Sequence, residues 1–199
     1  MKKLFFLVFT FLNVSVIFSQ EKMELFWILE DGKYGYIDRT GKVVIPPQFE
    51  NSVGFREGLA ATKMNGKYGY IDKTGKWVIE PKFDHTYMFS EGLAKVRIEG
   101  KLAWIDKNGN YVIKPTDAFE DADIGFSEGR TGVKINGKWG YIDTTGKVVI
   151  EPKFTKVSRF NGGVAQVHTE DGRHHWIDIN GRILWSEKIK PKDTKQKVN

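Results

Sequence analysis

The sequence predicts an all-β fold, a tandem repeat of five three-stranded antiparallel meanders, stacked as an open twisted array or as a propeller-like ring. Three observations predict it. A phrase that opens with glycine recurs five times, at Gly32, Gly66, Gly100, Gly137 and Gly172, and a period of roughly 35 residues is typical of stacked or circular repeat proteins. Each repeat holds two runs of aromatic and β-branched residues around a turn signal, which indicates a hairpin. Several runs are apolar on successive residues, as in strands buried between two layers.

The repeat that opens at Gly66 shows how three strands arise. Residues 68–72 and 77–79 are the two runs, and Asp72-Lys73-Thr74-Gly75 lies between them. In such a turn the Asp carboxylate accepts hydrogen bonds from backbone N–H groups, and Gly tolerates a positive φ. We therefore interpret the recurrent aspartates as turn caps in preference to calcium ligands, because each loop offers one carboxylate and calcium needs six or more oxygens.

A third run, residues 93–98, ends at a glycine turn that leads directly into the next repeat. Two-residue turns of this kind between apolar runs are strong hairpin signals, and they recur at Asn65-Gly66, Glu99-Gly100, Asn136-Gly137 and Asp171-Gly172. The third run should therefore pair forward. The five sheets are then expected to begin near Leu25, Leu59, Leu93, Arg130 and Val164.

Two further repeated positions indicate packing. Phenylalanines recur in pairs after the second run of the first four repeats, and we expect them to anchor the following loop in the core: Phe49/Phe55, Phe83/Phe89, Phe119/Phe126 and Phe154/Phe160. A small residue recurs in the first run, which predicts close approach by a neighbouring backbone or aromatic ring: Gly35, Gly69, Ala103 and Gly140.

The chain divides into three parts. Residues 1–19 are predicted to be a secretory signal peptide, because Lys2 and Lys3 precede a short apolar stretch with small residues near its end. That stretch is shorter than a comfortable bilayer span, although an uncleaved anchor is the alternative. Residues 20–185 form one domain of five repeats, and residues 186–199 form a lysine-rich tail that is expected to be solvated and disordered. We expect a secreted or periplasmic protein of the cell envelope, with no transmembrane span after cleavage.

Charge and cysteine content exclude several function classes. The net charge is +6, but the signal peptide and the tail carry most of it, and the repeats are nearly neutral with alternating signs. Nucleic-acid binding requires a focused basic face, so no nucleic-acid partner is expected. The chain has no cysteine, which excludes disulfides, metal–thiolate sites and a thiol nucleophile.

The fourth repeat reads Gly-Lys-Trp-Gly-Tyr-Ile-Asp from Gly137, then Gly-Lys-Val-Val-Ile from Gly146, with Pro152 and Phe154 after it. This phrase resembles the WG (KWG) repeat, and the resemblance covers about residues 24–185. A literal Trp-Gly occurs at Trp139-Gly140, and the other repeats depart from it as Tyr34-Gly35, Tyr68-Gly69, Leu102-Ala103 and His174-His175. The resemblance implies a β-rich protein, often bacterial and exported, with interaction roles and no established catalytic residues.

The histidines of the fifth repeat are the candidate metal ligands. A hairpin would bring His168 close to one of His174 and His175, since cross-strand neighbours lie about 5 Å apart. With Glu170 or Asp171 they could bind zinc or copper. Adjacent strand residues point to opposite faces, so only one of the pair can join His168. No metal, cofactor or catalytic residue is predicted, because the sequence shows no recognisable catalytic motif.

The aromatic residues raise a second possibility. Most of the tryptophans are expected in the core, but some could line a groove, and we place a possible interaction surface at Trp77, Trp104, Tyr111 and His174. The leading hypothesis is an exported, non-catalytic scaffold that binds a protein partner. The alternative is a glycan- or cell-wall-binding module that uses exposed aromatics, and a metal-binding protein or an enzyme comes third.

Overall fold

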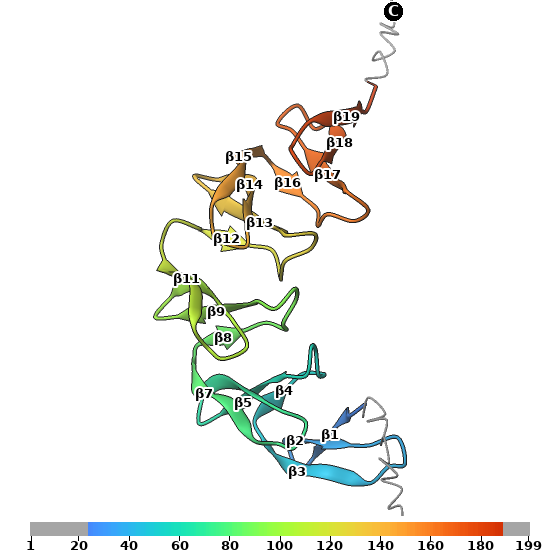
Figure 1. The fold of residues 1–199 in the computed structure, drawn as a ribbon, viewed down its shortest axis with the longest axis vertical. Coiled ribbons are helices and arrows are strands. Elements are labelled where there is room, and N and C mark those ends of the chain that lie inside the picture. Colours follow the sequence, from blue (N-terminus) through green and yellow to red (C-terminus); the bar gives the residue numbers. More distant parts are fainter. Residues whose placement is uncertain (1–23, 189–199) are drawn as a thin grey trace, which may run out of the picture.

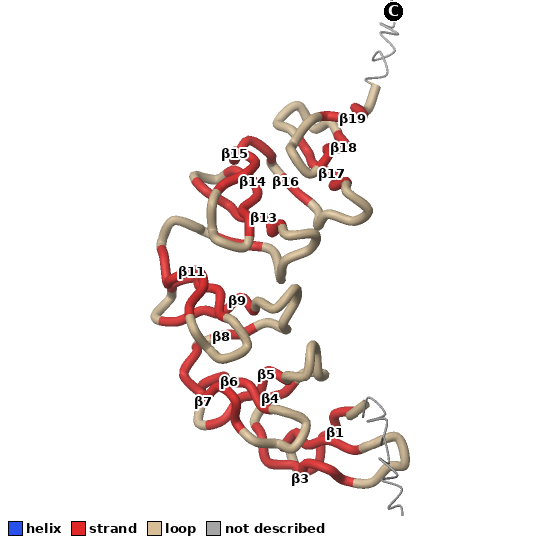
Figure 2. The backbone as a smooth tube through the Cα atoms, viewed as in Figure 1, coloured by secondary structure: helices blue, strands red, loops and turns tan. Residues whose placement is uncertain are grey.

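The computed structural model describes residues 24–188, and the predicted signal peptide and most of the tail lie outside them. The described chain forms five antiparallel β-sheets that follow one another along the long axis of the molecule (Figure 1). Strands and loops account for all of it, with no helix among residues 24–188 (Figure 2). The array is open: β1 and β19 lie at opposite ends (Figure 1). The all-β prediction is confirmed, and of the two predicted arrangements the open one is observed.

The strands are numbered in chain order and grouped by sheet. Sheet one contains β1 (Phe26–Glu30), β2 (Lys33–Ile37) and β3 (Val43–Phe49). Sheet two contains β4 (Asn51–Ser52), β5 (Ala60–Met64), β6 (Lys67–Ile71) and β7 (Trp77–Phe83). Sheet three contains β8 (His85–Thr86), β9 (Ala94–Ile98), β10 (Lys101–Ile105) and β11 (Tyr111–Thr116). Sheet four contains β12 (Asp121–Ala122), β13 (Arg130–Ile135), β14 (Lys138–Asp143) and β15 (Val148–Phe154). Sheet five contains β16 (Lys156–Val157), β17 (Val164–His168), β18 (His174–Asp178) and β19 (Ile183–Ser186).

The predicted meanders are the three long strands of each sheet, so the third run does pair forward. Sheets two to five also contain a fourth strand of two residues, in segments that the sequence pattern predicts as loops. This short strand follows the last strand of the preceding sheet and pairs with the first long strand of its own sheet, as Ser52 does with Thr62. Each short strand therefore ties two successive sheets together.

The turns have the expected chemistry with one exception. The Asp72 carboxylate accepts hydrogen bonds from the backbone N–H groups of Thr74 and Lys76 at 2.8 and 3.1 Å. The other repeated aspartates do the same at Asp38, Asp106, Asp143 and Asp178. The Asn65-Gly66 turn has positive φ at both residues, as a two-residue hairpin requires. In sheet five the predicted two-residue turn is wrong, because a five-residue loop separates His168 from His174.

At each junction, one face of a sheet packs against the opposite, non-equivalent face of the next sheet. At the second junction, Tyr70 and Ile79 of sheet two pack against Ala94 and Ile105 of sheet three. Phe89 fills the space between them with its ring centroid 4.9 Å from that of Tyr70. The paired phenylalanines therefore anchor the loops as predicted, except that Phe55 and Phe119 are only partly buried. The other junctions repeat this pattern with Tyr36, Trp104 and Tyr141 in the place of Tyr70.

A backbone bulge explains the repeated glycine. Tyr68 pairs with Phe83 and Tyr70 with Ile79, so Gly69 alone faces three residues of β7. A Cβ atom on Gly69 would overlap the Ile79 carbonyl oxygen. Of the two predicted neighbours, the backbone is the one observed. In sheet three the bulge is one residue shorter, and that sheet carries Ala103 at this position.

Tyrosine hydroxyls bridge three of the four junctions. Tyr36, Tyr70 and Tyr141 donate hydrogen bonds to backbone carbonyls of the following unit at 2.6–2.7 Å. Desolvation by burial raises the pKa of all three hydroxyls, so they remain protonated donors well above neutral pH. Each bridge therefore persists throughout the physiological pH range.

The junction between sheets three and four is bridged differently. Trp104 replaces the tyrosine and its indole N–H has no partner in the structure. The Lys95 ammonium group donates instead to the carbonyl of Ala122 in β12, and it lies 4.1 Å from the centre of the Tyr87 ring. Desolvation lowers the pKa of Lys95, although Asp121 and Asp123 oppose this shift. A buried lysine thus makes the connection that a tyrosine makes elsewhere.

Glutamates link the loops of successive units along one edge of the array. The Glu91 carboxylate accepts hydrogen bonds from the backbone N–H groups of Glu128 and Gly129 at 2.6 and 2.9 Å. Glu128 does the same for Gly162 and Gly163, and Glu57 accepts one from Gly92. We call Glu57, Glu91 and Glu128 the glutamate ladder.

Replacing Glu91 with glutamine is expected to lower the free energy of unfolding by about 1 kcal/mol. The amide would keep the size of the side chain but turn an NH₂ group toward one of the two N–H donors. Urea unfolding of the variant measures this loss. Glu80→Gln is the matched control, since Glu80 is exposed on β7, and equal unfolding midpoints for both variants would show that the ladder contributes no stability.

Candidate binding surface on the outer face of sheet five

The outer face of sheet five is the side turned away from sheet four. Ala165, Val167 and Ile177 pack against sheet four, and strand alternation places their neighbours on the other side. These neighbours are Gln166, His168, His174, Trp176 and Trp185. Trp176 and Trp185 are direct cross-strand partners and are 41% and 51% exposed. Among residues 24–188 no further sheet covers this face.

The histidine pair lies beside the tryptophans. His168 and His174 are cross-strand partners, and their ring centroids are 4.0 Å apart. Desolvation is the largest cause that lowers the pKa of His168, and the adjacent His174 lowers it further. The second effect arises because two positively charged imidazolium rings would repel each other. The side-chain amide of Gln166 lies 3.2 Å from His174 Nδ1. The prediction that only one of His174 and His175 could meet His168 is confirmed.

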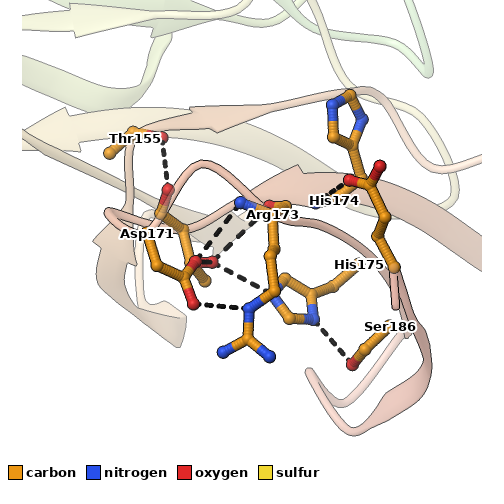
Figure 3. A network of polar contacts seen from close by, with 8 residues as sticks. Thr155, Asp171, Arg173, His174, His175 and Ser186 are labelled. Carbon is orange, nitrogen blue, oxygen red and sulfur yellow. Dashed lines mark hydrogen bonds and ion pairs between the residues drawn. The ribbon is translucent and has the colours of Figure 1, made fainter. Parts of the chain in front are cut away.

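His175 lies on the opposite side of β18 and is 4% exposed. Its Nδ1 lies 2.8 Å from the Ser186 hydroxyl and its Nε2 lies 3.0 Å from the Thr169 hydroxyl. The Arg173 side chain donates to Asp171 (Figure 3). The Thr169 hydroxyl donates to the same carboxylate. His175 occupies the position of Gly69, so this network replaces the bulge of the other sheets and holds the loop before β18.

Acid should loosen this loop in a way that depends on Asp171. The Thr169 hydroxyl, followed by the backbone and side chain of Arg173, lowers the pKa of Asp171 to about 2. Because the folded-state pKa lies below the unfolded value, the stabilisation is present above about pH 4 and is lost as the pH falls toward 2. Asp171→Asn should therefore show a shallower decline of the unfolding midpoint between pH 4 and 2 than the parent protein. Parallel curves for the two proteins would contradict this.

Of the predicted metal ligands of the fifth repeat, the structure brings His168 and His174 together. Residues 24–188 contain no group of three or more His, Cys, Asp or Glu side chains that could hold a metal ion. Asp171 is engaged by Thr169 and Arg173, and Lys138 pairs with Glu170. His168 and His174 remain as two adjacent imidazoles, too few ligands for a structural zinc site.

The structure also revises the predicted interaction surface. Trp104 is fully buried at the third junction, so its prediction as a surface residue is wrong. Trp77 is half-buried against Phe49, and Tyr111 packs beside the core of the second junction. His174 does lie on the outer face of sheet five. Trp176 and Trp185 are exposed but were not among the predicted surface residues, although their place in the last repeat could have distinguished them.

The glutamate ladder has no member in the fifth unit. Gly162 occupies the loop position of Glu57, Glu91 and Glu128, and a glycine has no carboxylate to offer to a following unit. Trp176 likewise replaces the bridging tyrosine and has no hydroxyl. Sheet five therefore lacks both the loop glutamate and the bridging tyrosine that join neighbouring sheets elsewhere in the array.

The family model described as "WG containing repeat" matches residues 34–68, 68–101, 104–139 and 139–171, more than half of the chain. No curated protein matches the chain. Residues 24–188 contain no helix long and apolar enough to cross a membrane.

Solved structures share the fold at low sequence identity. A eukaryotic initiation factor has a TM-score of 0.56 and 10% identity over 84% of this chain and 52% of its own. Hsv2 from Kluyveromyces lactis has a TM-score of 0.53 and 12% identity over 83% and 61%. This chain thus spans about half of the first structure and about six tenths of the second.

Proposed function

We propose that this chain, which belongs to the WG-repeat family, is a binding scaffold that holds a protein partner on the outer face of sheet five. The observation that carries the proposal is the exposed cross-strand pair Trp176 and Trp185. Paired aromatics that are open to solvent, with polar groups beside them, are typical of protein-interaction surfaces. Open repeat arrays of this kind usually have polar end faces, so an aromatic end face favours binding.

A binding role is favoured over a catalytic one by the chemistry of the fifth repeat. The ring nitrogens of His175 are both engaged by hydroxyl groups, and His168 and His174 face each other. The Ser186 and Thr169 hydroxyls lie beside His175, but this imidazole is 4% exposed and both of its nitrogens are engaged, so it has none free for a substrate. We therefore assign these side chains to shaping and lining the surface.

We further propose that the scaffold acts outside the cytoplasm, in the periplasm or at the cell surface. Support comes from residues 1–19, which combine two lysines with a short apolar stretch. Export can be measured directly: fractionation of cells that produce the full chain should place it in the envelope or medium, with an N-terminus near Gln20. A full-length cytoplasmic protein would overturn this part of the proposal.

Photo-crosslinking tests the binding surface. A photo-reactive phenylalanine derivative at position 185 should give discrete covalent protein adducts in intact cells. The matched control carries the same group at position 78, because Val78 is 43% exposed but lies on sheet two. Adducts at 185 alone, lost on Trp176→Ser, support the proposal. Equal adducts at both positions, or none at 185, would overturn it.

A glycan partner is the second candidate, favoured by the same tryptophans. Sugar rings stack on exposed indoles, and Gln166 and His174 offer hydrogen-bonding groups next to them. Glycan-array binding that quenches tryptophan fluorescence, and that is lost on Trp185→Ser, would identify this function. Silence on the array would exclude the glycans tested.

A further inference from the structure

A row of polar side chains crosses the outer face of sheet five at right angles to its strands. Lys156 of β16 pairs with His168 of β17, and His168 pairs with His174 of β18. Glu187 follows β19, and its N–H donates to the His174 carbonyl at 2.9 Å. It lies two residues after Trp185 and therefore on the same side of the strand. The row has an exposed cation at one end and an exposed anion at the other, and neither makes an ion pair within residues 24–188.

A second row lies beside the first and is ordered by side-chain size. The Ser158 N–H donates to the Gln166 carbonyl at 2.9 Å, and the Gln166 N–H donates to the Ser158 hydroxyl at 2.9 Å. Gln166 pairs with Trp176, and Trp176 pairs with Trp185. The serine side chain stays close to the backbone, whereas both indoles reach solvent. The face is therefore low beside β16 and high at β18 and β19.

Each row complements itself when its order is reversed. A two-fold axis that runs along the strands, between β17 and β18, brings the outer faces of two copies together with this reversal. Lys156 of each copy then faces Glu187 of the other copy, so opposite charges meet in the first row. Trp185 of each copy faces Ser158 of the other copy, so a large side chain meets a small one in the second row. Packed sheets commonly have their strands aligned in this way.

The other axis that could join the two faces does not give this match. An axis across the strands keeps β16 over β16 and β19 over β19 of the second copy. Lys156 then faces either Lys156 or an uncharged side chain, and Glu187 likewise meets no cation. Because like charges in an interface oppose association and opposite charges favour it, the order of the first row selects the axis that runs along the strands.

We propose that the partner of the outer face of sheet five is the same face of a second copy of this chain, related by a two-fold axis along the strands between β17 and β18. This assignment rests on the proposed function, since it names the partner for the same surface. The contact uses one patch on both copies, so it closes at two chains and does not build rows. A face of four strands is small for an interface, so a reversible dimer with a Kd in the micromolar range is expected.

Histidine rings lie nearest to this axis, so acid should weaken the contact. His168 of each copy faces His174 of the other copy. Desolvation is the largest cause that lowers the pKa of His168, followed by His174 and Lys156. Glu187 opposes this shift, and the uncharged Gln166 side chain lies beside His174. In the dimer Glu187 pairs with Lys156, so protonated imidazoles would repel one another across the axis. Association is expected to weaken about tenfold or more between about pH 8 and pH 5.5.

Sedimentation of the exported chain over about a hundredfold concentration range measures the dimer. Lys156→Glu and Glu187→Lys each place like charges opposite one another at both ends of the first row, so each variant alone should associate about tenfold or more weakly. An equal mixture of the two should form mixed dimers as strongly as the parent, because every acidic end then meets a basic one. Lys114→Glu is the matched control, since Lys114 is exposed on β11 of sheet three, and it should associate like the parent. A mixture that associates no better than its components would overturn the proposal.

The photo-reactive group at position 185 tests the register of the same dimer. In the purified chain it should give an adduct of two chains, with the new bond close to Ser158 of the second copy. Attachment to β19 or to sheet one of the second copy would overturn the proposal, and so would association that is unchanged by acid.

A purified chain that stays monomeric at every concentration also overturns the second copy as partner. If position 185 of that monomer still gives adducts with other proteins in intact cells, the proposed function stands with a different partner. If it gives no adducts, both the dimer and the proposed function fall.

Discussion

Gly69→Ala is expected to lower the free energy of unfolding by about 3 kcal/mol or more. The new Cβ would overlap the Ile79 carbonyl oxygen and lie 2.8 Å from backbone atoms of Glu80 and Pro81. These are backbone atoms of a bulge that proline stiffens, so they cannot move aside as a flexible side chain would. Urea unfolding followed by circular dichroism measures the loss.

Gly54→Ala is the matched control for this change. A Cβ at Gly54 would meet nothing within 4 Å, and Gly54 has no positive φ. Its effect should therefore stay within about 0.5 kcal/mol and can be slightly stabilising, because alanine restricts the unfolded chain. If Gly69→Ala and Gly54→Ala unfold at the same urea concentration, the bulge is not the reason for the repeated glycine.

Phe89→Ala is expected to cost about 3–5 kcal/mol. The ring is 2% exposed and lies in the core of the second junction, where it contacts the ring of Tyr70. Its removal leaves a cavity between two sheets that depend on each other for burial. The short strands and the glutamate ladder fix the spacing of neighbouring sheets, so these sheets can close into the cavity only in part.

The residue next to Phe89 provides the control. Met88 is 45% exposed, so Met88→Ala should change the stability by less than about 0.5 kcal/mol. Thermal unfolding of both variants, monitored by tryptophan fluorescence, separates the two cases. A loss below about 1 kcal/mol for Phe89→Ala would show that the loop is not anchored by this ring.

The sequence predicted the hairpins and the boundaries of the meanders well, because turn chemistry is local. The Asp72 carboxylate binds N–H groups two and four residues ahead, so its role can be inferred from a few letters. The turn at Asp171-Gly172 was the exception. There the Thr169 N–H donates to the Arg173 carbonyl and the Gly172 N–H donates to the Thr169 carbonyl. This is the backbone pattern of the Asp-x-x-Gly turns, with Thr169 in the place of the aspartate.

The short fourth strands and the glutamate ladder could not be predicted in the same way. Asn51–Ser52 has no alternating pattern and forms a strand because the edge of β5 offers it hydrogen-bond partners. Glu91 reads as an ordinary polar loop residue, and its role emerges only when the loop of Glu128 lies beside it. Both depend on how successive sheets stack.

The all-β repeat, its five units and the strands within each follow from the sequence alone, because period, turn residues and alternation are properties of neighbouring positions. Whether the array stays open and which tryptophans are exposed depend on how the sheets pack. Trp104 and Trp176 occupy equivalent places in their repeats, yet one is fully buried and the other is 41% exposed. The physical reason is that burial depends on whether another sheet covers the same face, and sheet four covers Trp104 while no described sheet covers Trp176.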